Sequence, residues 1–387
     1  MNTLLGGLDT ATFLSEYWQR KPLLIRQAMP GFQSPLSAEQ LAGLSLEPEI
    51  ESRLILQTDT APGWELRVGP FTEQAFSTLP ADRWTLLIQD VEKHLPELVD
   101  VLDRFRFLPD WRIDDLMISH AAPGGSVGPH RDNYDVFLLQ AQGERRWLID
   151  QRTDVVHGEQ ADTPLKLVRD FRPTDTWILR PGDMLYLPPG IPHHGIAEND
   201  CQTWSIGFRA SRMQELLGEM LDRLLEAQDP DTFLRDAGRA AVDHPAVIDE
   251  TTLRAVRSQV RAALAVNDAM IDRWFAGHVT EPKAAFAGKR RHAEIDHAGL
   301  RARLLAGTVV IRNPASRIAL LDQVTAAWLY ADGSEWPLTG PALALARVLT
   351  DQRQIPLSTL EPLLREDDAV ALLVNLINAD HWFFADD

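Results

Sequence analysis

Two short segments of the chain carry side chains that together can hold a metal ion. In residues 128–132 (GPHRD), His130 and Asp132 stand two positions apart. Side chains at this spacing project to the same face of an extended chain, so both can reach one ion. Further along, residues 188–195 (PPGIPHHG) place histidines at a rigid turn. Two histidines and one carboxylate form the facial triad of non-haem Fe(II) oxygenases, which leaves positions open for a cosubstrate and dioxygen.

The third ligand comes from His193 or from its neighbour His194. We choose His193, because Pro192 fixes its backbone approach, and keep His194 as the alternative. An H-x-D pair alone occurs often by chance and is then usually a surface feature. Here a hydrophobic strand, a glycine-rich turn and a distant Pro-Pro-Gly turn accompany it, and together they favour a metal site.

Two adjacent arginines, Arg145 and Arg146, are candidates for binding a cosubstrate. A 2-oxoglutarate oxygenase needs a fixed cation for the distal carboxylate of 2-oxoglutarate, and a guanidinium offers a bidentate partner. Neighbouring side chains on a strand point to opposite faces, so the arginine that faces outward is expected to extend into solvent. Ser119, on the strand ahead of the metal-binding turn, can donate a hydrogen bond to the same carboxylate or be a plain strand serine.

Short apolar runs separated by turn residues predict the strands that position these side chains. The runs are residues 116–119, 136–139, 146–149, 177–179, 184–187 and 204–208. Many short strands at this spacing are typical of a β-sandwich or a jelly-roll barrel. Ahead of them, Asp9 or Thr10 can cap a helix across residues 13–18, and Ser37 with Gln40 forms a capping box for a second helix.

The chain becomes helical after Ala210. Leucines and methionines from Met213 to Leu225 recur at helical spacing, and a similar pattern continues to Trp274. This stripe exceeds what one short helix pair can bury, which favours a homodimer, with packing against the barrel as the alternative. Later strands and helices alternate in an order that fits a winged helix. We expect three parts: a barrel with N-terminal helices (1–210), a helical dimerisation segment (211–285) and an α+β domain (286–387).

The composition excludes several classes of protein. The 387 residues are 45% hydrophobic and 24% charged, which argues against a disordered, collagenous or membrane protein. A net charge of −18 argues against direct binding to nucleic acid and favours a cationic partner. Cys201 is the only cysteine, so a thiolate-rich zinc site is excluded. The N-terminus lacks the pattern of a secretory signal, and we expect a cytoplasmic protein.

Several motifs resemble the bacterial branch of the Jumonji-C (JmjC) ribosomal oxygenases, and within it the arginine hydroxylases of a large-subunit ribosomal protein. The motifs are FL…YW…KPLL (13–24), DDLMIS (114–119), PGGSVGPHRDNYDVF (123–137), G-x-R-x-W (143–147), LYLPPG (185–190) and HWFF (381–384). They extend over nearly the whole chain, and the resemblance is therefore specific.

The resemblance implies a double-stranded β-helix (jelly-roll, cupin-like JmjC barrel), a helical dimerisation segment and a C-terminal winged-helix domain. The activity it implies is hydroxylation of an arginine β-carbon in a large-subunit ribosomal protein, with Fe(II) as cofactor and 2-oxoglutarate and dioxygen as cosubstrates. It implies the following site residues: metal ligands His130, Asp132 and His193, and cosubstrate-binding residues Arg145 and Ser119.

A basic substrate side chain also needs a carboxylate near the metal, and Asp115 is the candidate. If residues 116–119 form a strand in register with it, Asp115, Met117 and Ser119 share one face. An aspartate at the start of a strand more often caps a turn, which is the structural alternative.

Two other classes of function compete with the protein hydroxylase. A cupin-type metalloenzyme acting on a small molecule shares the barrel and the triad, but has no use for Arg145 or for the C-terminal domains. A broken triad would favour a noncatalytic ribosome-binding scaffold. The triad is intact here, which argues against that function. A winged helix also suggests DNA binding as a function, but the acidity of the chain argues against it.

Overall fold

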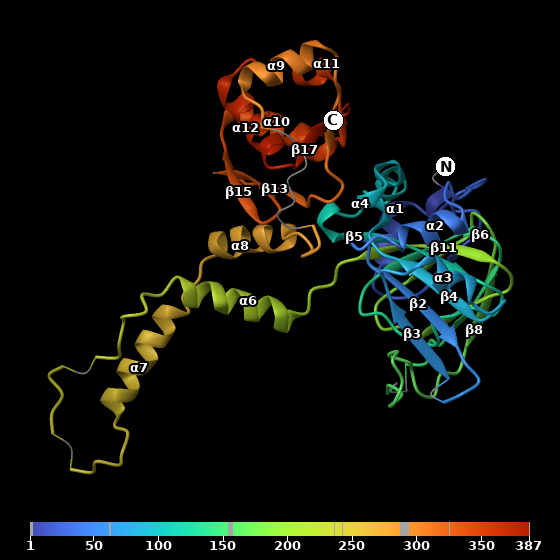
Figure 1. Cartoon of the computed structure of the whole chain (residues 1–387). Coiled ribbons are helices and arrows are strands. Elements are labelled where there is room, and N and C mark those ends of the chain that lie inside the picture. Colours follow the sequence, from blue (N-terminus) through green and yellow to red (C-terminus); the bar gives the residue numbers. More distant parts are fainter. Residues whose placement is uncertain are drawn as a thin grey trace. The chain divides into compact units, whose positions relative to one another are not determined.

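The computed structural model describes residues 3–61, 63–153, 158–235, 237–241, 243–286, 294–324 and 326–386. The chain divides into two compact units. Unit 1 contains most of the chain up to Ala210 and two short later segments, which include Lys283 and Asn313. Unit 2 contains the helices after Ala210 and the C-terminal part of the chain (Figure 1). Among the described residues, no helix combines the length and the apolar character needed to cross a membrane.

Unit 1 is built around two antiparallel sheets. The larger sheet has the strand order β1 (Leu23–Ile25), β9 (Met184–Leu187), β6 (Val136–Gln142), β11 (Cys201–Phe208), β5 (Ile113–Ala121), β4 (Trp84–Ile88), β2 (Ser52–Gln57), β3 (Trp64–Val68). The smaller sheet has the order β10 (His193–Ala197), β7 (Arg145–Ile149), β8 (Asp175–Leu179). Every predicted strand run lies in one of these strands.

Alternation along the strands divides the apolar side chains between two faces of the larger sheet. Val136 and Leu138 of β6 pack with Trp147 of β7 in a cluster between the sheets. Phe137, on the opposite face, packs against Phe13 at 5.7 Å between ring centroids. Two facing sheets with a filled interior confirm the predicted double-stranded β-helix.

Helices cover the outer face of the larger sheet. They are α1 (Thr10–Glu16), α2 (Ala38–Leu44), α3 (Glu73–Ser77), α4 (Val91–His94) and α5 (Val99–Asp103), with 3₁₀ turns at Thr3–Leu5, Pro96–Leu98 and Asp110–Arg112. Asp9 caps α1 by accepting a hydrogen bond from the Thr12 amide, and Ser37 and Gln40 form the expected capping box of α2. Helices α3 to α5 interrupt the strands between Ser52 and Trp147.

Strand β10 was not predicted, because its sequence His193-His194-Gly195-Ile196-Ala197 has no run of β-branched or aromatic residues. It forms by pairing along its whole length with β7. The turn at residues 188–192 therefore leads directly into a strand, and His193 is the first residue of that strand.

Unit 2 begins with three amphipathic helices, α6 (Met213–Glu226), α7 (Glu250–Ala263) and α8 (Asp268–Thr280) (Figure 1). Four apolar side chains of α6 are exposed at intervals of four residues, namely Met213, Leu217, Leu221 and Leu225. Leu224 of the same helix is buried. Helix α6 therefore buries one apolar side, which carries Leu224, inside the unit. A second apolar side of the helix is exposed at the surface of the unit.

The rest of unit 2 combines small sheets with helices around one core. The sheets are β16 (Gln354–Ile355), β12 (Val310–Arg312), β17 (Trp382–Phe384) and β13 (Ile318–Asp322), β14 (Ala327–Ala331), β15 (Ser334–Leu338). The helices are α9 (His297–Leu305), α10 (Gly340–Asp351), α11 (Leu357–Leu360) and α12 (Asp367–Asn378). Leu345, Leu373 and Trp382 are fully buried in this core. Strands β13 and β15 flank β14 as its hairpin partners.

Candidate active site

Backbone hydrogen bonds hold the two histidine-bearing segments together. The His130 amide donates to the His193 carbonyl at 3.0 Å, and the His193 amide donates to the His130 carbonyl at 2.8 Å. The Gly190 amide donates to the Asp132 carbonyl at 2.7 Å. The turn at residues 188–192 is thus tied to both ends of the H-x-D segment, and the positions of all three side chains follow from the backbone.

The side chains of His130, Asp132 and His193 converge. Their ligand atoms all lie within 4.8 Å of one another. The Oδ2 atom of Asp132 is 3.9 Å from Nε2 of His130 and 3.6 Å from Nε2 of His193. Each imidazole uses Nδ1 for a 2.9 Å bond to a carbonyl two residues earlier, that of Gly128 or Ile191. These bonds orient the rings and leave both Nε2 atoms facing the carboxylate.

Burial keeps the imidazole of His193 neutral, which is the form that binds metal. It lowers the pKa of His193 to about 4, with the neighbouring His130 acting in the same direction. Burial likewise lowers the pKa of His194 to about 4. His194 is the next residue along β10, and its ring lies 6.1 Å from that of Phe171, outside the three-residue cluster. The donor set of two imidazoles and one carboxylate fits a divalent iron.

Glycine is required in the turn that precedes the H-x-D segment. Gly128 has φ +79°, and a Cβ atom there would lie 2.4 Å from Leu167 Cδ2 and 3.2 Å from Trp64 Cζ2. A side chain at this position would therefore displace two neighbours and strain the backbone.

Arg145 is buried inside the barrel with hydrogen-bonding capacity left over. Its guanidinium donates from Nη2 to the Gly195 carbonyl at 3.3 Å. Its Nε and Nη1 atoms have no partner among the residues that the structure describes. Burial lowers the pKa of Arg145, but a guanidinium stays charged at neutral pH. A buried cation with two free donors fits the carboxylate of a cosubstrate.

Gly195 makes the space that this guanidinium occupies. It lies opposite Trp147 in the β10–β7 pair. A Cβ atom at position 195 would be 2.6 Å from Nε of Arg145 and 2.8 Å from the Trp147 ring. The absence of a side chain is therefore what allows the arginine to lie over the tryptophan ring, with its guanidinium carbon 5.2 Å from the ring centroid.

The neighbouring candidates differ in where their side chains lie. Arg146 points away from the barrel interior, is 44% exposed, and pairs with Glu198 at 2.6 Å. Ser119 is buried, and its hydroxyl donates to the Thr203 carbonyl over a long 3.3 Å bond. That bond is weak enough to be exchanged for a bound carboxylate.

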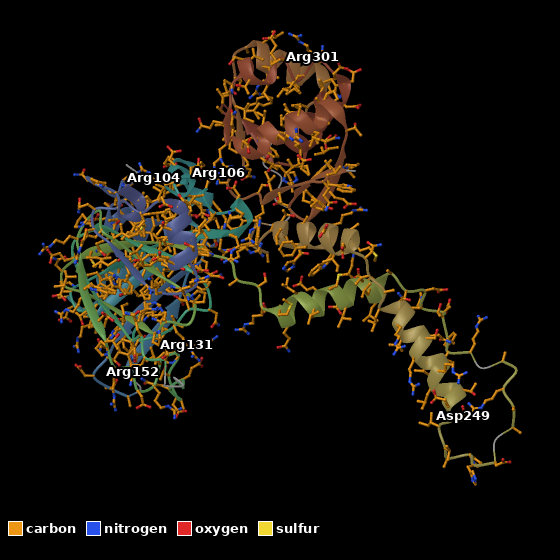
Figure 2. The ribbon with its side chains drawn as sticks, turned by 180° about the vertical axis from the view of Figure 1, so that it is seen from behind. Arg104, Arg106, Arg131, Arg152, Asp249 and Arg301 are labelled. Carbon is orange, nitrogen blue, oxygen red and sulfur yellow. The ribbon has the colours of Figure 1, made fainter. Side chains whose placement is uncertain are left out.

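One cavity of about 450 Å³ is lined by the three triad candidates, Arg145 and Ser119. Its lining includes Asp115, Met117, Ser119, His130, Asp132, Tyr134, Arg145 and His193. Asp115, Met117 and Ser119 line it from β5, whereas Tyr134 follows the H-x-D segment. Arg131, labelled in Figure 2, is exposed and also belongs to the lining. The sequence indicates Met117 only as a neighbour of Asp115 and Ser119 on one strand face, and Tyr134 only as part of the motif at residues 123–137. It does not predict that either residue lines the cavity.

Asp115 is buried at the start of β5 and has two polar neighbours. Gln89 donates from Nε2 to Oδ2 of Asp115 at 2.8 Å, and Nζ of Lys283 lies 3.5 Å from the same oxygen. Burial raises the pKa of Asp115 to about 6, and Lys283 opposes this rise. The carboxylate form therefore predominates at neutral pH, and a charged acceptor faces the cavity.

Lys283 connects Asp115 to a second buried group of charges. Its Nζ lies 2.8 Å from Asp90, which also pairs with Lys93. Burial acts to lower the pKa of Lys283, but the carboxylates around it outweigh this effect and raise it. Glu92, buried beside Lys93, accepts a hydrogen bond from the Leu116 amide at 2.9 Å. No local sequence pattern indicates that Lys283 contacts Asp90 and Asp115, because Lys283 comes from a distant part of the chain.

Two family models match the chain in separate regions. A JmjC domain matches residues 100–216, and a ROXA-like winged helix matches residues 255–383. The first match contains all the triad candidates and Arg145. The second confirms the winged helix expected from the order of elements in the C-terminal region.

A curated protein and two solved structures from Escherichia coli match nearly the whole chain. The ribosomal protein uL16 3-hydroxylase of E. coli K12 is 30% identical over 97% of this chain and 98% of its own length. A probable ribosomal oxygenase of Haemophilus influenzae is 36% identical, over 58% of this chain and 55% of its own. The X-ray structure of E. coli YcfD superposes with a TM-score of 0.85 at 30% identity, covering 98% of each chain. YcfD in complex with cobalt and 2-oxoglutarate superposes with a TM-score of 0.81 at 30% identity, over 98% of this chain and 99% of YcfD.

Proposed function

Because the chain belongs to the JmjC-domain ribosomal oxygenases, we propose that it is an Fe(II)- and 2-oxoglutarate-dependent oxygenase that hydroxylates an arginine side chain of a large-subunit ribosomal protein. Within that side chain, the β-carbon is the proposed site of hydroxylation. One observation carries it: a two-histidine-one-carboxylate cluster and a buried arginine with free donors open into the same cavity as Asp115.

The metal ion would be held by His130, Asp132 and His193, and 2-oxoglutarate by Arg145 with help from Ser119. When bound, iron and 2-oxoglutarate supply the oxidising chemistry that inserts one oxygen atom of dioxygen into a substrate C–H bond. The protein fixes the geometry, because the imidazoles are oriented by their Nδ1 bonds and Arg145 by its bond to Gly195. Apolar side chains between the sheets keep the interior dry, which strengthens the pairing of Arg145 with a carboxylate.

Asp115 would bind the guanidinium of the substrate. It faces the cavity from the same side as Met117 and Ser119, and it is ionised at neutral pH. Gln89 and Lys283 approach it at Oδ2. The other oxygen is then available for a cationic side chain. The net charge of −18 favours the approach of a basic ribosomal protein at low salt, and this advantage decreases as salt rises.

We expect the purified protein, supplied with Fe(II) and 2-oxoglutarate, to add one oxygen atom to an arginine of ribosomal protein uL16. The proposed site reads a positive charge, so a peptide with citrulline in place of that arginine should be turned over roughly thirtyfold less, or worse. Mass spectrometry of the peptides measures both the added oxygen and its position. Ribosomal proteins from cells with and without this protein provide the cellular comparison.

The Asp115→Asn variant is the matched test on the enzyme. It keeps the shape of the side chain and removes its charge, so KM for the arginine peptide should rise while KM for 2-oxoglutarate stays the same. Equal turnover of the arginine and citrulline peptides would show that charge is not what the site reads. An unchanged peptide KM in Asp115→Asn would remove Asp115 from the substrate site.

The helices after Ala210 would make a homodimer, with residues 1–210, 211–285 and 286–387 acting as catalytic, dimerisation and winged-helix parts. The exposed stripe of α6 supports this proposal: Met213 is 67% exposed, Leu217 57%, Leu221 45% and Leu225 70%. Such a continuous apolar face is typical of an interface. Direct binding of nucleic acid by the winged helix is not part of the proposal, and we place the reaction in the cytoplasm.

We expect sedimentation of the intact chain at micromolar concentration to show a dimer. Replacing both Leu217 and Leu221 by glutamate should shift the protein to a monomer, because charges would then replace the centre of the apolar face. The control is Gln214→Glu, which adds a charge to an exposed polar position of the same helix. A wild-type protein that sediments only as a monomer would refute the dimer.

A further inference from the structure

A second cluster of metal-ligating side chains lies in unit 2, between helices α6 and α8. It consists of Glu219 from α6 with His278 and Glu281 from the C-terminal end of α8. One ligand atom from each of these residues lies within 4.8 Å of the others. Figure 1 shows α6 and α8 as neighbouring helices of this unit. The triad candidates belong to unit 1, so this cluster is separate from them.

The histidine of the cluster is buried and lacks hydrogen bonds. His278 is 9% exposed, and neither ring nitrogen has a hydrogen-bond partner among the described residues. Its Nδ1 lies 2.5 Å from Oε2 of Glu219, in contact but without hydrogen-bond alignment. The ring stacks on Trp274, with centroids 5.5 Å apart and planes 18° apart. A buried imidazole without satisfied nitrogens is unfavourable unless something else binds them.

The backbone fixes the end of α8 that carries two of the three residues. His278 lies in the last turn of α8, and Glu281 is the residue that ends the helix, with its amide donating to the His278 carbonyl at 3.2 Å. Thr280, between them, accepts a hydrogen bond at its hydroxyl from the Gly333 amide at 3.3 Å. Gly333 has φ +78° and lies next to Glu281, since a Cβ atom at position 333 would lie in ordinary contact, 3.5 Å, with its Cγ. The cluster is therefore built on a helix end tied to the β14–β15 turn.

The cluster opens into a cavity of about 710 Å³ whose lining is rich in acidic groups. Asp222, Glu226 and Glu335 line it in addition to the two glutamates of the cluster. Two arginines also line it, and one of them, Arg273, is paired with Glu335 at 2.5 Å. The charge of the lining favours a bound cation.

We propose that Glu219, His278 and Glu281 bind a divalent transition-metal ion, with zinc as the best fit. One imidazole nitrogen and two carboxylate oxygens are the donors of an open tetrahedral zinc site, whose fourth position a water molecule can take. The ion would join α6 to α8 and satisfy His278. It would thereby hold the helix whose outer face carries Leu217 and Leu221.

The test uses the full chain carrying His130→Ala and Asp132→Ala, so that the triad in unit 1 no longer contributes a metal site. After stripping with chelator, this protein is titrated with zinc by calorimetry, and with cobalt to record the absorption spectrum of the bound ion. We expect one zinc per chain and a cobalt spectrum typical of four-coordinate geometry. Zinc should also raise the Tm.

Three variants in the same background decide which residues bind the ion. His278→Ala should abolish zinc binding, and Glu219→Gln should weaken it by about tenfold or more, because one of three protein ligands is lost. Glu219 is half-exposed, so this variant tests the site even if His278→Ala fails to fold. Asp222→Asn, in the same cavity but outside the cluster, should bind zinc like its parent. No zinc bound by the parent, or undiminished binding by Glu219→Gln, would overturn the proposal and leave His278 and Glu219 as an ion pair.

Discussion

Replacing Asp132 by alanine is expected to abolish turnover of 2-oxoglutarate and of the peptide substrate while the protein remains folded. Asp132 is the only anionic member of the triad, and its Oδ2 faces both Nε2 atoms. Loss of groups that merely support metal ligands costs about 10–100-fold in affinity or activity, so loss of a ligand should exceed roughly a hundredfold. Succinate formation and peptide mass measure the activity, and circular dichroism reports the fold.

The two adjacent histidines provide a matched pair for the same assay. His193→Ala should lose activity as Asp132→Ala does, because Nε2 of His193 lies 3.6 Å from the carboxylate. His194→Ala should keep most of the activity, since its ring packs against Phe171. The reverse ranking would mean that His194 is the third ligand and that the triad is assigned incorrectly.

Replacing Arg145 by alanine should raise the KM for 2-oxoglutarate by about two to four orders of magnitude. The guanidinium is 2% exposed, and its removal leaves a buried carboxylate of the cosubstrate without its charge partner. Breaking a buried pair in this way costs roughly 3–5 kcal/mol, and about 1.4 kcal/mol corresponds to a factor of ten. Titration of the initial rate with 2-oxoglutarate measures the effect.

Arg146→Ala is the control for that variant. Arg146 is next in sequence but 44% exposed and paired with Glu198, and surface pairs contribute little. Its loss should change the KM for 2-oxoglutarate less than about twofold. If Arg146→Ala raised this KM and Arg145→Ala left it unchanged, the wrong arginine would have been assigned to the cosubstrate.

The sequence predicts the barrel well because its strands are apolar runs separated by turn residues. Strand β6, for example, opens with four apolar residues, 136–139, and every residue of the strand except Gln142 is buried. Strand β10 carries no such signal, since it exists only through pairing with β7. Strand β13 does carry an apolar run, residues 318–321, whereas β15 contains Glu335 and Pro337 and becomes a strand through its hairpin pairing with β14.

The candidate site is predictable where it depends on local spacing and not where it depends on distant contacts. The H-x-D spacing and the following Pro-Pro-Gly turn indicate three side chains that the fold brings within 4.8 Å of one another. Alternation on a strand shows that Arg145 and Arg146 face opposite ways, but which one is buried follows only from the sheet packing. Nothing near Lys283 in the sequence indicates Asp115 as its neighbour, because the two residues are 168 positions apart.

Lys283 belongs to unit 1, although the chain that precedes it belongs to unit 2. The chain leaves unit 1 at Ala210, forms three helices, and returns a lysine to the carboxylates of Asp90 and Asp115. A gene fragment that ends at Ala210 would encode the whole triad and Arg145, yet it would lack this lysine. The catalytic part is therefore not a freely exchangeable module, and recombination between relatives must carry the returning segment along with the barrel.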